Sequence, residues 1–112
     1  MAGEASGAHP VPGFRLGTAC AGIRKPGRTD LLVMELAAGG TAAAVFTRNR
    51  FRAAPVRIAE RHLAGQAPRY CLVNTGVANA GTGERGEADA LACCRALAER
   101  TGCAPEAVRP FS

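Results

Sequence analysis

The sequence YCLVNTGVANAGTGERGEADALACCRALAER, residues 70–100, decides the fold of this chain. Its first five residues, Tyr70–Asn74, form a short apolar run that predicts a strand. From Glu84 to Arg100, apolar residues recur at helical spacing, and the set on one stripe comprises Ala90, Leu91, Cys94, Leu97 and Ala98. The two segments predict a strand followed by a helix that packs on the sheet.

The ends of the predicted helix carry the expected signals. Glu84 and Glu87 lie in its first turn, where the N-terminal end of the helix dipole favours acidic side chains, and Arg100 lies in the last turn. Gly102 follows as a stop. The helix is therefore predicted to run over roughly Glu84–Arg100.

Between strand and helix, residues 74–83 combine many small residues with two asparagines, Asn74 and Asn79. Small residues let another backbone or a ligand approach closely, and an asparagine side chain both donates and accepts hydrogen bonds. A turn whose asparagines satisfy the backbone of the loop explains the same composition. Composition favours neither hypothesis over the other.

Residues 81–86, GTGERG, match the pattern G-x-G-x-x-G between a strand and a helix. In a dinucleotide fingerprint the first glycine turns directly off the strand, and the pyrophosphate lies at the start of the helix. Here a further loop separates Asn74 from Gly81, and Glu84 would put a carboxylate where the pyrophosphate belongs. A nicotinamide or flavin site is therefore not expected, and the lack of G-K-[ST] excludes a P-loop.

Towards the N-terminus the sequence predicts more of the sheet. Phe14–Ile23 and Leu31–Leu36, separated by a turn that contains proline and glycine, form a candidate hairpin. Third and fourth strands are predicted at Ala42–Thr47 and around Val56 and Ile58. Short helical turns are predicted at Glu60–Ala64, which Gly65 ends, and at Pro105-Glu106. The fold class is α/β, of the α+β kind, with a mixed sheet of about five short strands and one main helix packed on it.

Both faces of the strand Leu31–Leu36 are apolar until Glu35, which indicates a sheet covered on one side and partly on both. We expect the main helix to cover the face that carries Leu32, Met34, Leu36, Cys71 and Val73. A second layer is then needed for the opposite face, which carries Leu31, Val33 and Leu72.

The chain has a net charge of +5, because 14 lysines and arginines outnumber 9 acidic residues. A basic chain raises the question of nucleic acid, but the arginines are scattered, and aromatic residues, at 4%, are few for a base-stacking surface. Arg48, Arg50 and Arg52 alternate, which suggests a strand with one basic face or, more commonly, a solvated and charge-protected segment. No nucleic-acid partner is expected.

Residues 1–13 lack the basic and apolar regions of a secretory signal, and no apolar run is long enough for a membrane span. The five cysteines include no C-x-x-C pair and are interpreted as reduced, mostly buried small hydrophobes, which indicates a cytoplasmic protein. His9 and His62 have no neighbours at metal-ligand spacing, so no metal site is predicted. No motif such as G-x-S-x-G marks a nucleophile.

Five tracts along the chain belong together. They are HPVPGF at 9–14, AGIRKPG at 21–27, AVFTRNR at 44–50 with AAPV at 53–56, the loop at 74–83, and VRPFS at 108–112. In this order they resemble the N-terminal part of the ornithine acetyltransferase family, the bifunctional glutamate N-acetyltransferases of arginine biosynthesis. The resemblance covers essentially residues 9–112 and implies an incomplete part of a layered, self-cleaving acetyltransferase fold.

The resemblance implies a cytoplasmic enzyme that moves an acetyl group from N-acetylornithine to glutamate, in some members also from acetyl-CoA. Members of the family cut themselves into α and β chains, and the new N-terminal threonine of the β chain is the nucleophile. The implied partners are these substrates and the β chain of the same precursor, in a heterotetramer of two α and two β chains. No cofactor is needed for the cyclic reaction, apart from acetyl-CoA as a co-substrate in some members.

In the family, a Thr-Gly pair that forms the oxyanion hole follows directly after the position of Ser112, and the nucleophilic threonine lies further on. The chain is therefore expected to be truncated, to hold no catalytic residue and to be inactive by itself. Asn74 and Asn79 are its candidate substrate-lining residues, in a loop where Val77 stands in place of the family's usual asparagine.

We divide the chain into a loosely ordered arm, residues 1–13, and an N-terminal α/β portion of the acetyltransferase, residues 14–112. Two other functions remain compatible with the residues. One is an amidohydrolase on a related self-cleaving fold, because a fold does not determine a function. The other is a small basic module that binds nucleic acid through Arg48, Arg50 and Arg52.

Overall fold

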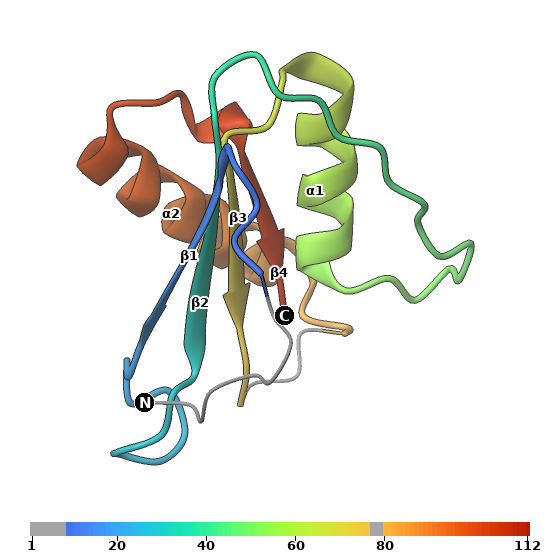
Figure 1. Cartoon of the computed structure of the whole chain (residues 1–112). Helices are drawn as coiled ribbons and strands as arrows, with labels where there is room; N and C mark the ends of the chain where they lie inside the picture. The colour runs from blue at the N-terminus through green and yellow to red at the C-terminus, as the bar shows by residue number, and fades with distance from the viewer. Residues whose placement is uncertain (1–8, 77–79) are drawn as a thin grey trace.

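A computed structural model describes residues 9–76 and 80–112. Most of the predicted N-terminal arm therefore lies outside the described residues. The strands are β1 (Phe14–Ala19), β2 (Leu31–Leu36), β3 (Tyr70–Asn74) and β4 (Val108–Phe111). The helices are α1 (Ala54–Gly65), α2 (Gly83–Thr101) and a 3₁₀ turn at Pro105–Ala107, as Figure 1 shows.

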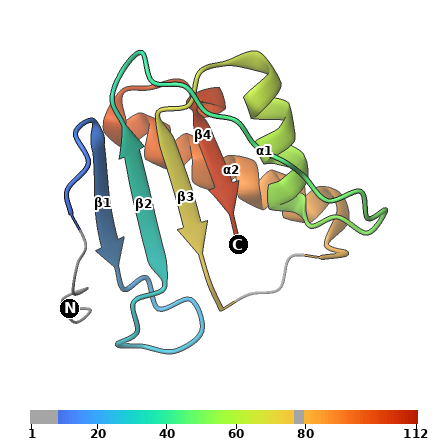
Figure 2. The ribbon, with the colours of Figure 1, turned by 45° about the vertical axis from the view of Figure 1, so that its right-hand side comes forward.

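The four strands form one sheet in the order β1-β2-β3-β4. β1, β2 and β3 pair in antiparallel fashion, whereas β3 and β4 are parallel. Two parallel neighbours need a long crossover, and α2 supplies it by running across one face of the sheet, as Figure 2 shows. The mixed α/β class predicted from the sequence is confirmed.

The predicted N-terminal hairpin is confirmed. Phe14 pairs with Leu36 at one end of β1 and β2, and Ala19 pairs with Leu31 at the other. β1 is an edge strand whose residues are all exposed, and Leu16 keeps 63% of its surface in water. The hairpin therefore contributes little to the core through its outer strand.

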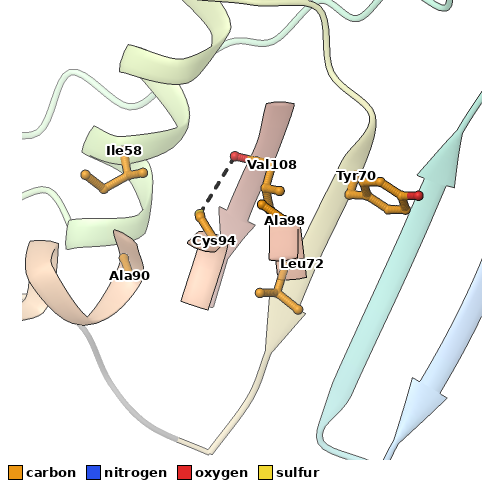
Figure 3. Packing of buried hydrophobic residues seen from close by; sticks show 7 residues of the cluster. All are labelled: Ile58, Tyr70, Leu72, Ala90, Cys94, Ala98 and Val108. Carbon is orange, nitrogen blue, oxygen red and sulfur yellow. Dashed lines mark hydrogen bonds between the residues drawn. The ribbon is translucent and has the colours of Figure 1, made fainter. Parts of the chain in front are cut away.

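The core lies between the sheet and the two helices. Figure 3 shows its buried members, which are Ile58, Tyr70, Leu72, Ala90, Cys94, Ala98 and Val108. The stripe predicted for the helix is confirmed, since Ala90, Cys94 and Ala98 are buried and Leu91 and Leu97 pack against them. Gly102, with φ +76°, ends α2 by donating its N–H to the carbonyl of Ala98.

The expected orientation of the sheet is wrong. α2 covers the face of Leu31, Val33 and Leu72, and the face of Cys71 lies opposite. Alternation divides a strand into two faces, but when both are apolar it does not say which one a helix takes. The opposite face is partly covered by residues 42–46 and by α1, which enclose an apolar cavity of about 130 Å³.

Two predicted strands are wrong. Residues 42–47 form an irregular segment, because three alanines in succession offer little side chain for packing on a sheet. The run at Val56 and Ile58 belongs to α1, which begins at a proline-containing first turn. Ile58, Ala59 and His62 are buried at helical spacing. Burial of this stripe outweighs the strand propensity of the β-branched Val56 and Ile58.

The interpretation of the cysteines as mostly buried is also wrong. All five are free, but Cys20 and Cys93 are exposed, Cys71 and Cys103 are half-buried, and only Cys94 is buried. In the part of the chain that the structure describes, no helix is long and apolar enough to cross a membrane.

Candidate functional site

The carboxyl ends of β3 and β4 meet at one edge of the sheet because the strands are parallel. Val73 pairs with Phe111, and the next residues along the two strands are Asn74 and Ser112. Asn74 is half-buried, and its side-chain amide has no hydrogen-bond partner among the described residues. In open α/β sheets the carboxyl ends of parallel strands are where ligands bind, so this edge is the candidate site.

Of the two candidate lining residues, the structure places Asn74 at this edge. Asn79 lies outside the described residues, as does Val77. The helix that follows the loop starts at Gly83, close to the predicted Glu84. The edge thus consists of the end of β3, the end of β4 and the turn between β1 and β2.

Asp30 ties that turn to the end of β3. Its carboxylate accepts the backbone N–H groups of Ala21 at 2.6 Å and Ile23 at 2.8 Å, which hold the pKa of Asp30 below its usual value. The backbone of Asp30 donates to Ala19 and accepts from the N–H of Thr75 at 3.1 Å. One buried carboxylate therefore shapes the turn next to Asn74.

A basic pocket of about 220 Å³ opens beside this anchor. It is lined by Arg24, Lys25, Arg28, Thr29, Asp30, Thr75 and Gly76. Gly76 has φ +103°, and a Cβ there would lie 3.1 Å from the Cβ of Arg24. Glycine is needed for both reasons, because it alone adopts this conformation freely and lets the two segments approach.

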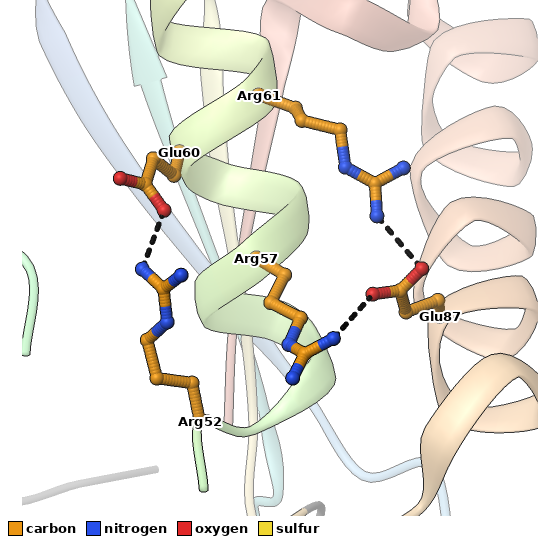
Figure 4. A network of polar contacts seen from close by, with 5 residues as sticks. All are labelled: Arg52, Arg57, Glu60, Arg61 and Glu87. Carbon is orange, nitrogen blue, oxygen red and sulfur yellow. Dashed lines mark hydrogen bonds and ion pairs between the residues drawn. The ribbon is translucent and has the colours of Figure 1, made fainter. Parts of the chain in front are cut away.

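A second pocket, of about 250 Å³, lies at the start of the two helices, and Gly81 and Gly83 of the segment GTGERG are among its lining residues. Figure 4 shows that its two arginines are paired: Arg52 with Glu60 at 2.7 Å, and Arg57 with Glu87 at 3.6 Å. Arg61 of α1 also pairs with Glu87, at 2.7 Å. The Arg61 hydrogen bond lowers the pKa of Glu87 most, and the charge of Arg57 adds to it. The pocket's positive charge is thus largely neutralised.

Two glycines of GTGERG, Gly81 and Gly86, have packing roles, and the third, Gly83, has φ +61° with open space around it. A Cβ at Gly81 would overlap the ring of Phe51, and one at Gly86 would overlap Thr82. Gly86 also lets α2 approach Ala54 at the start of α1. Packing at Gly81 and Gly86 and the positive φ of Gly83 account for the three glycines without a nucleotide.

Sequence reasoning missed the basic pocket. Its signal is the tract RKPGR at 24–28, which was interpreted as a turn and as part of a family tract but not as a binding site. The basic segment at 48–52 is an irregular loop, in agreement with the commoner of its two interpretations, and Arg52 is engaged by Glu60. Within the residues that the structure describes, no three His, Cys, Asp or Glu side chains gather as metal ligands.

Known proteins from several bacteria have similar sequences. The chain is 56% identical over 103 residues to the arginine biosynthesis bifunctional protein ArgJ of Methylococcus capsulatus, a match that covers 92% of this chain and 25% of that protein. It is 54% identical to the protein of the same name from Neisseria gonorrhoeae, again with 25% of that protein covered. The chain thus spans about a quarter of the length of these relatives.

Solved structures agree. The arginine biosynthesis bifunctional protein ArgJ of Bacillus halodurans superposes with a TM-score of 0.81 at 29% identity, over 90% of this chain and 54% of that chain. Ornithine acetyltransferase of Mycobacterium tuberculosis, solved in complex with ornithine, gives 0.76 at 35% identity, over 90% and 56%. The mixed sheet with its crossover helix is therefore a fold of arginine-biosynthesis enzymes. The profile of the ArgJ family matches residues 15–112, and the chain belongs to this family.

Proposed function

We propose that this chain forms the N-terminal scaffold, and one wall of the active site, of a cytoplasmic acetyltransferase that moves acetyl from N-acetylornithine to glutamate. Membership of the ArgJ family supports the proposal, as does the similarity to an ornithine acetyltransferase solved with ornithine. The observation that carries it is the meeting of Asn74 and Ser112 at the carboxyl ends of the two parallel strands.

The proposed chemistry uses an N-terminal threonine of a second chain cut from the same precursor. Its hydroxyl attacks the acetyl carbonyl while its own α-amine takes the proton; the tetrahedral intermediate then expels ornithine, whose amine receives that proton, and leaves an acetyl-threonine ester. The amine of glutamate attacks this ester, takes the acetyl group and releases the threonine hydroxyl. Oxyanion donors are proposed directly after Ser112, where β4 would deliver them to the edge that Asn74 occupies.

Several parts of the proposal follow from this arrangement. We propose that the nucleophile and the oxyanion donors lie outside residues 1–112 and that the chain alone is therefore inactive. The partners are the β chain, in a heterotetramer of two α and two β chains, and the two amino-acid substrates. In this proposal the cyclic reaction needs no cofactor, and acetyl-CoA serves as a further acetyl donor in some members of the family.

In this proposal the Asn74 amide binds substrate. It is half-buried at the edge and lacks a partner among the described residues, so a substrate carbonyl or ammonium group can complete its hydrogen bonds. A neutral hydrogen bond contributes about 1 kcal/mol, which corresponds to roughly a fivefold effect on rate or affinity.

The test is N-acetylornithine-dependent acetylation of glutamate by the full-length protein, with Asn74→Ala compared to Asn49→Ala in an exposed loop. We expect Asn74→Ala to lower kcat/KM roughly three- to tenfold with an unchanged melting temperature, and Asn49→Ala to leave kcat/KM unchanged. Equal effects of the two variants would contradict the role of Asn74. Release of acetate without transfer to glutamate would instead identify an amidohydrolase.

A further inference from the structure

We propose that the basic pocket between the β1–β2 turn and the end of β3 binds a phosphate group of a small molecule. The pocket residues that carry the proposal are Arg24, Lys25, Arg28, Thr29 and Thr75. The proposal does not depend on acetyl transfer, because it rests on the charge and shape of this pocket alone.

The three cations of the pocket are available to a ligand. Among the described residues, Arg24, Lys25 and Arg28 form no ion pair. The pocket at the start of the helices serves as the internal comparison, because both of its arginines, Arg52 and Arg57, pair with carboxylates. Unpaired like charges held together repel one another, and an anion relieves that repulsion.

Asp30 also lines the pocket, but its two oxygens already accept the N–H groups of Ala21 and Ile23. It therefore fixes the turn that carries the cations and pairs with none of them. Three cations and one carboxylate leave a net charge of two positive in the pocket. This charge matches a phosphate monoester, which carries about −1.5 to −2 at neutral pH, better than a single carboxylate.

The shape of the pocket is consistent with a phosphate group. A water molecule occupies ~30 Å³ of liquid, so a pocket of about 220 Å³ has room for a phosphoryl group and part of the molecule that carries it. Thr29 and Thr75 add hydroxyl donors to the cations. The close approach of Gly76 to Arg24 holds the two walls together.

The lining argues against nucleic acid as the source of the phosphate. No aromatic side chain lines the pocket among the described residues, so a base would find no stacking partner. The exposed Phe51, by contrast, lies at the other pocket, beside Gly81. A small phosphorylated molecule is the occupant that fits.

The experiment measures binding of inorganic phosphate and pyrophosphate by calorimetry at low salt, with the protein as its gene encodes it. Arg24→Gln/Arg28→Gln removes two pocket cations, and Arg48→Gln/Arg50→Gln removes the same charge from an exposed loop outside the pocket. We expect saturable pyrophosphate binding that the first variant weakens at least tenfold and the second less than twofold. Circular dichroism checks that both variants fold.

If the double variant fails to fold, Lys25→Gln takes its place, and we expect it to weaken pyrophosphate binding at least threefold. Equal weakening by the pocket and loop variants would overturn the proposal, since it would mean that only the overall charge attracts the anion. Lack of saturable binding would overturn it too. The proposal would also be wrong if glutamate bound with the same dependence on these arginines while pyrophosphate did not bind. It would be wrong as well if a single-stranded oligonucleotide bound more tightly than pyrophosphate.

Discussion

His62 Nδ1 lies 2.7 Å from the carbonyl oxygen of Val108, and this contact joins α1 to β4 inside the core. A carbonyl only accepts, so Nδ1 of this histidine carries the proton and donates it. His62 is 6% exposed and Val108 is fully buried, so water cannot replace a lost partner easily. The histidine is therefore the stronger of two side-chain donors to this carbonyl, because the second, the thiol of Cys94, lies 3.8 Å away (Figure 3).

Replacing His62 with alanine should lower the free energy of unfolding by about 1–3 kcal/mol, because the buried carbonyl of Val108 then keeps only the weak and distant thiol donor of Cys94. Urea denaturation followed by circular dichroism measures the change. His62→Asn offers a donor near the position of Nδ1 and should recover part of the loss. A His62→Ala protein as stable as the original would show that the contact contributes nothing.

Two adjacent cysteines should differ sharply in reactivity. Burial raises the pKa of the Cys94 thiol to about 11, whereas Cys93 faces solvent on the next position of α2. The thiolate is the reactive form, so iodoacetamide at pH 8 should label Cys20 and Cys93 and spare Cys94. Peptide mass spectrometry before and after unfolding in urea reads this out. Labelling of Cys94 in the folded protein at the rate of Cys93 would mean that α2 does not bury this stripe.

Two glycines in helices should respond to alanine with opposite signs. A Cβ at Gly86 would overlap Thr82 and lie 3.2 Å from the Cβ of Ala54, so Gly86→Ala should cost about 1–3 kcal/mol through overpacking between α2 and α1. Gly65 meets nothing within 4 Å, and Gly65→Ala should stabilise by about 0.4–1 kcal/mol. Melting temperatures that rise in both variants would contradict the close helix contact.

Asp30→Asn should make stability less dependent on acid. The N–H groups of Ala21 and Ile23 hold the pKa of Asp30 below its ordinary 3.8, so the carboxylate stabilises the folded state fully above that pH. The contribution is lost as the pH falls through the lowered pKa of the folded protein. The stability difference between the two proteins should thus be largest above pH 3.8 and shrink below it. Urea midpoints from pH 7 down to pH 3 measure it, and a constant difference would contradict this role.

Periodicity predicted the elements whose packing agrees with their local pattern. Apolar residues follow strand spacing in β1, β2 and β3 and helical spacing in α2. Gly102 marks the end of α2 by its positive φ. α1 was missed because Val56 and Ile58 are β-branched, while its true signal was Pro55 at the start and His62 a full turn after Ile58. In α1, burial of one helical stripe therefore outweighed the strand propensity of individual residues.

β4 and the candidate site were harder to predict because both depend on contacts between distant segments. Val108–Phe111 contains Pro110, which lacks an N–H and is tolerated because β4 is an edge strand. Asn74 was named from composition, but its place beside Ser112 follows from the parallel register of β3 and β4. The basic pocket likewise needs Gly76 to meet Arg24, which no local pattern encodes.

The parallel pairing of β3 and β4 also sets the order in which the chain can fold. The β1–β2 hairpin pairs strands that are close in the sequence. Tyr70 and Val108, by contrast, are separated along the chain by the whole α2 crossover. Loop closure costs more entropy as the loop grows, and pairings between distant residues slow folding. Because Val108 belongs to the buried core, the hairpin is a local unit that can form first, and the core closes in a late step that needs α2 and β4 together.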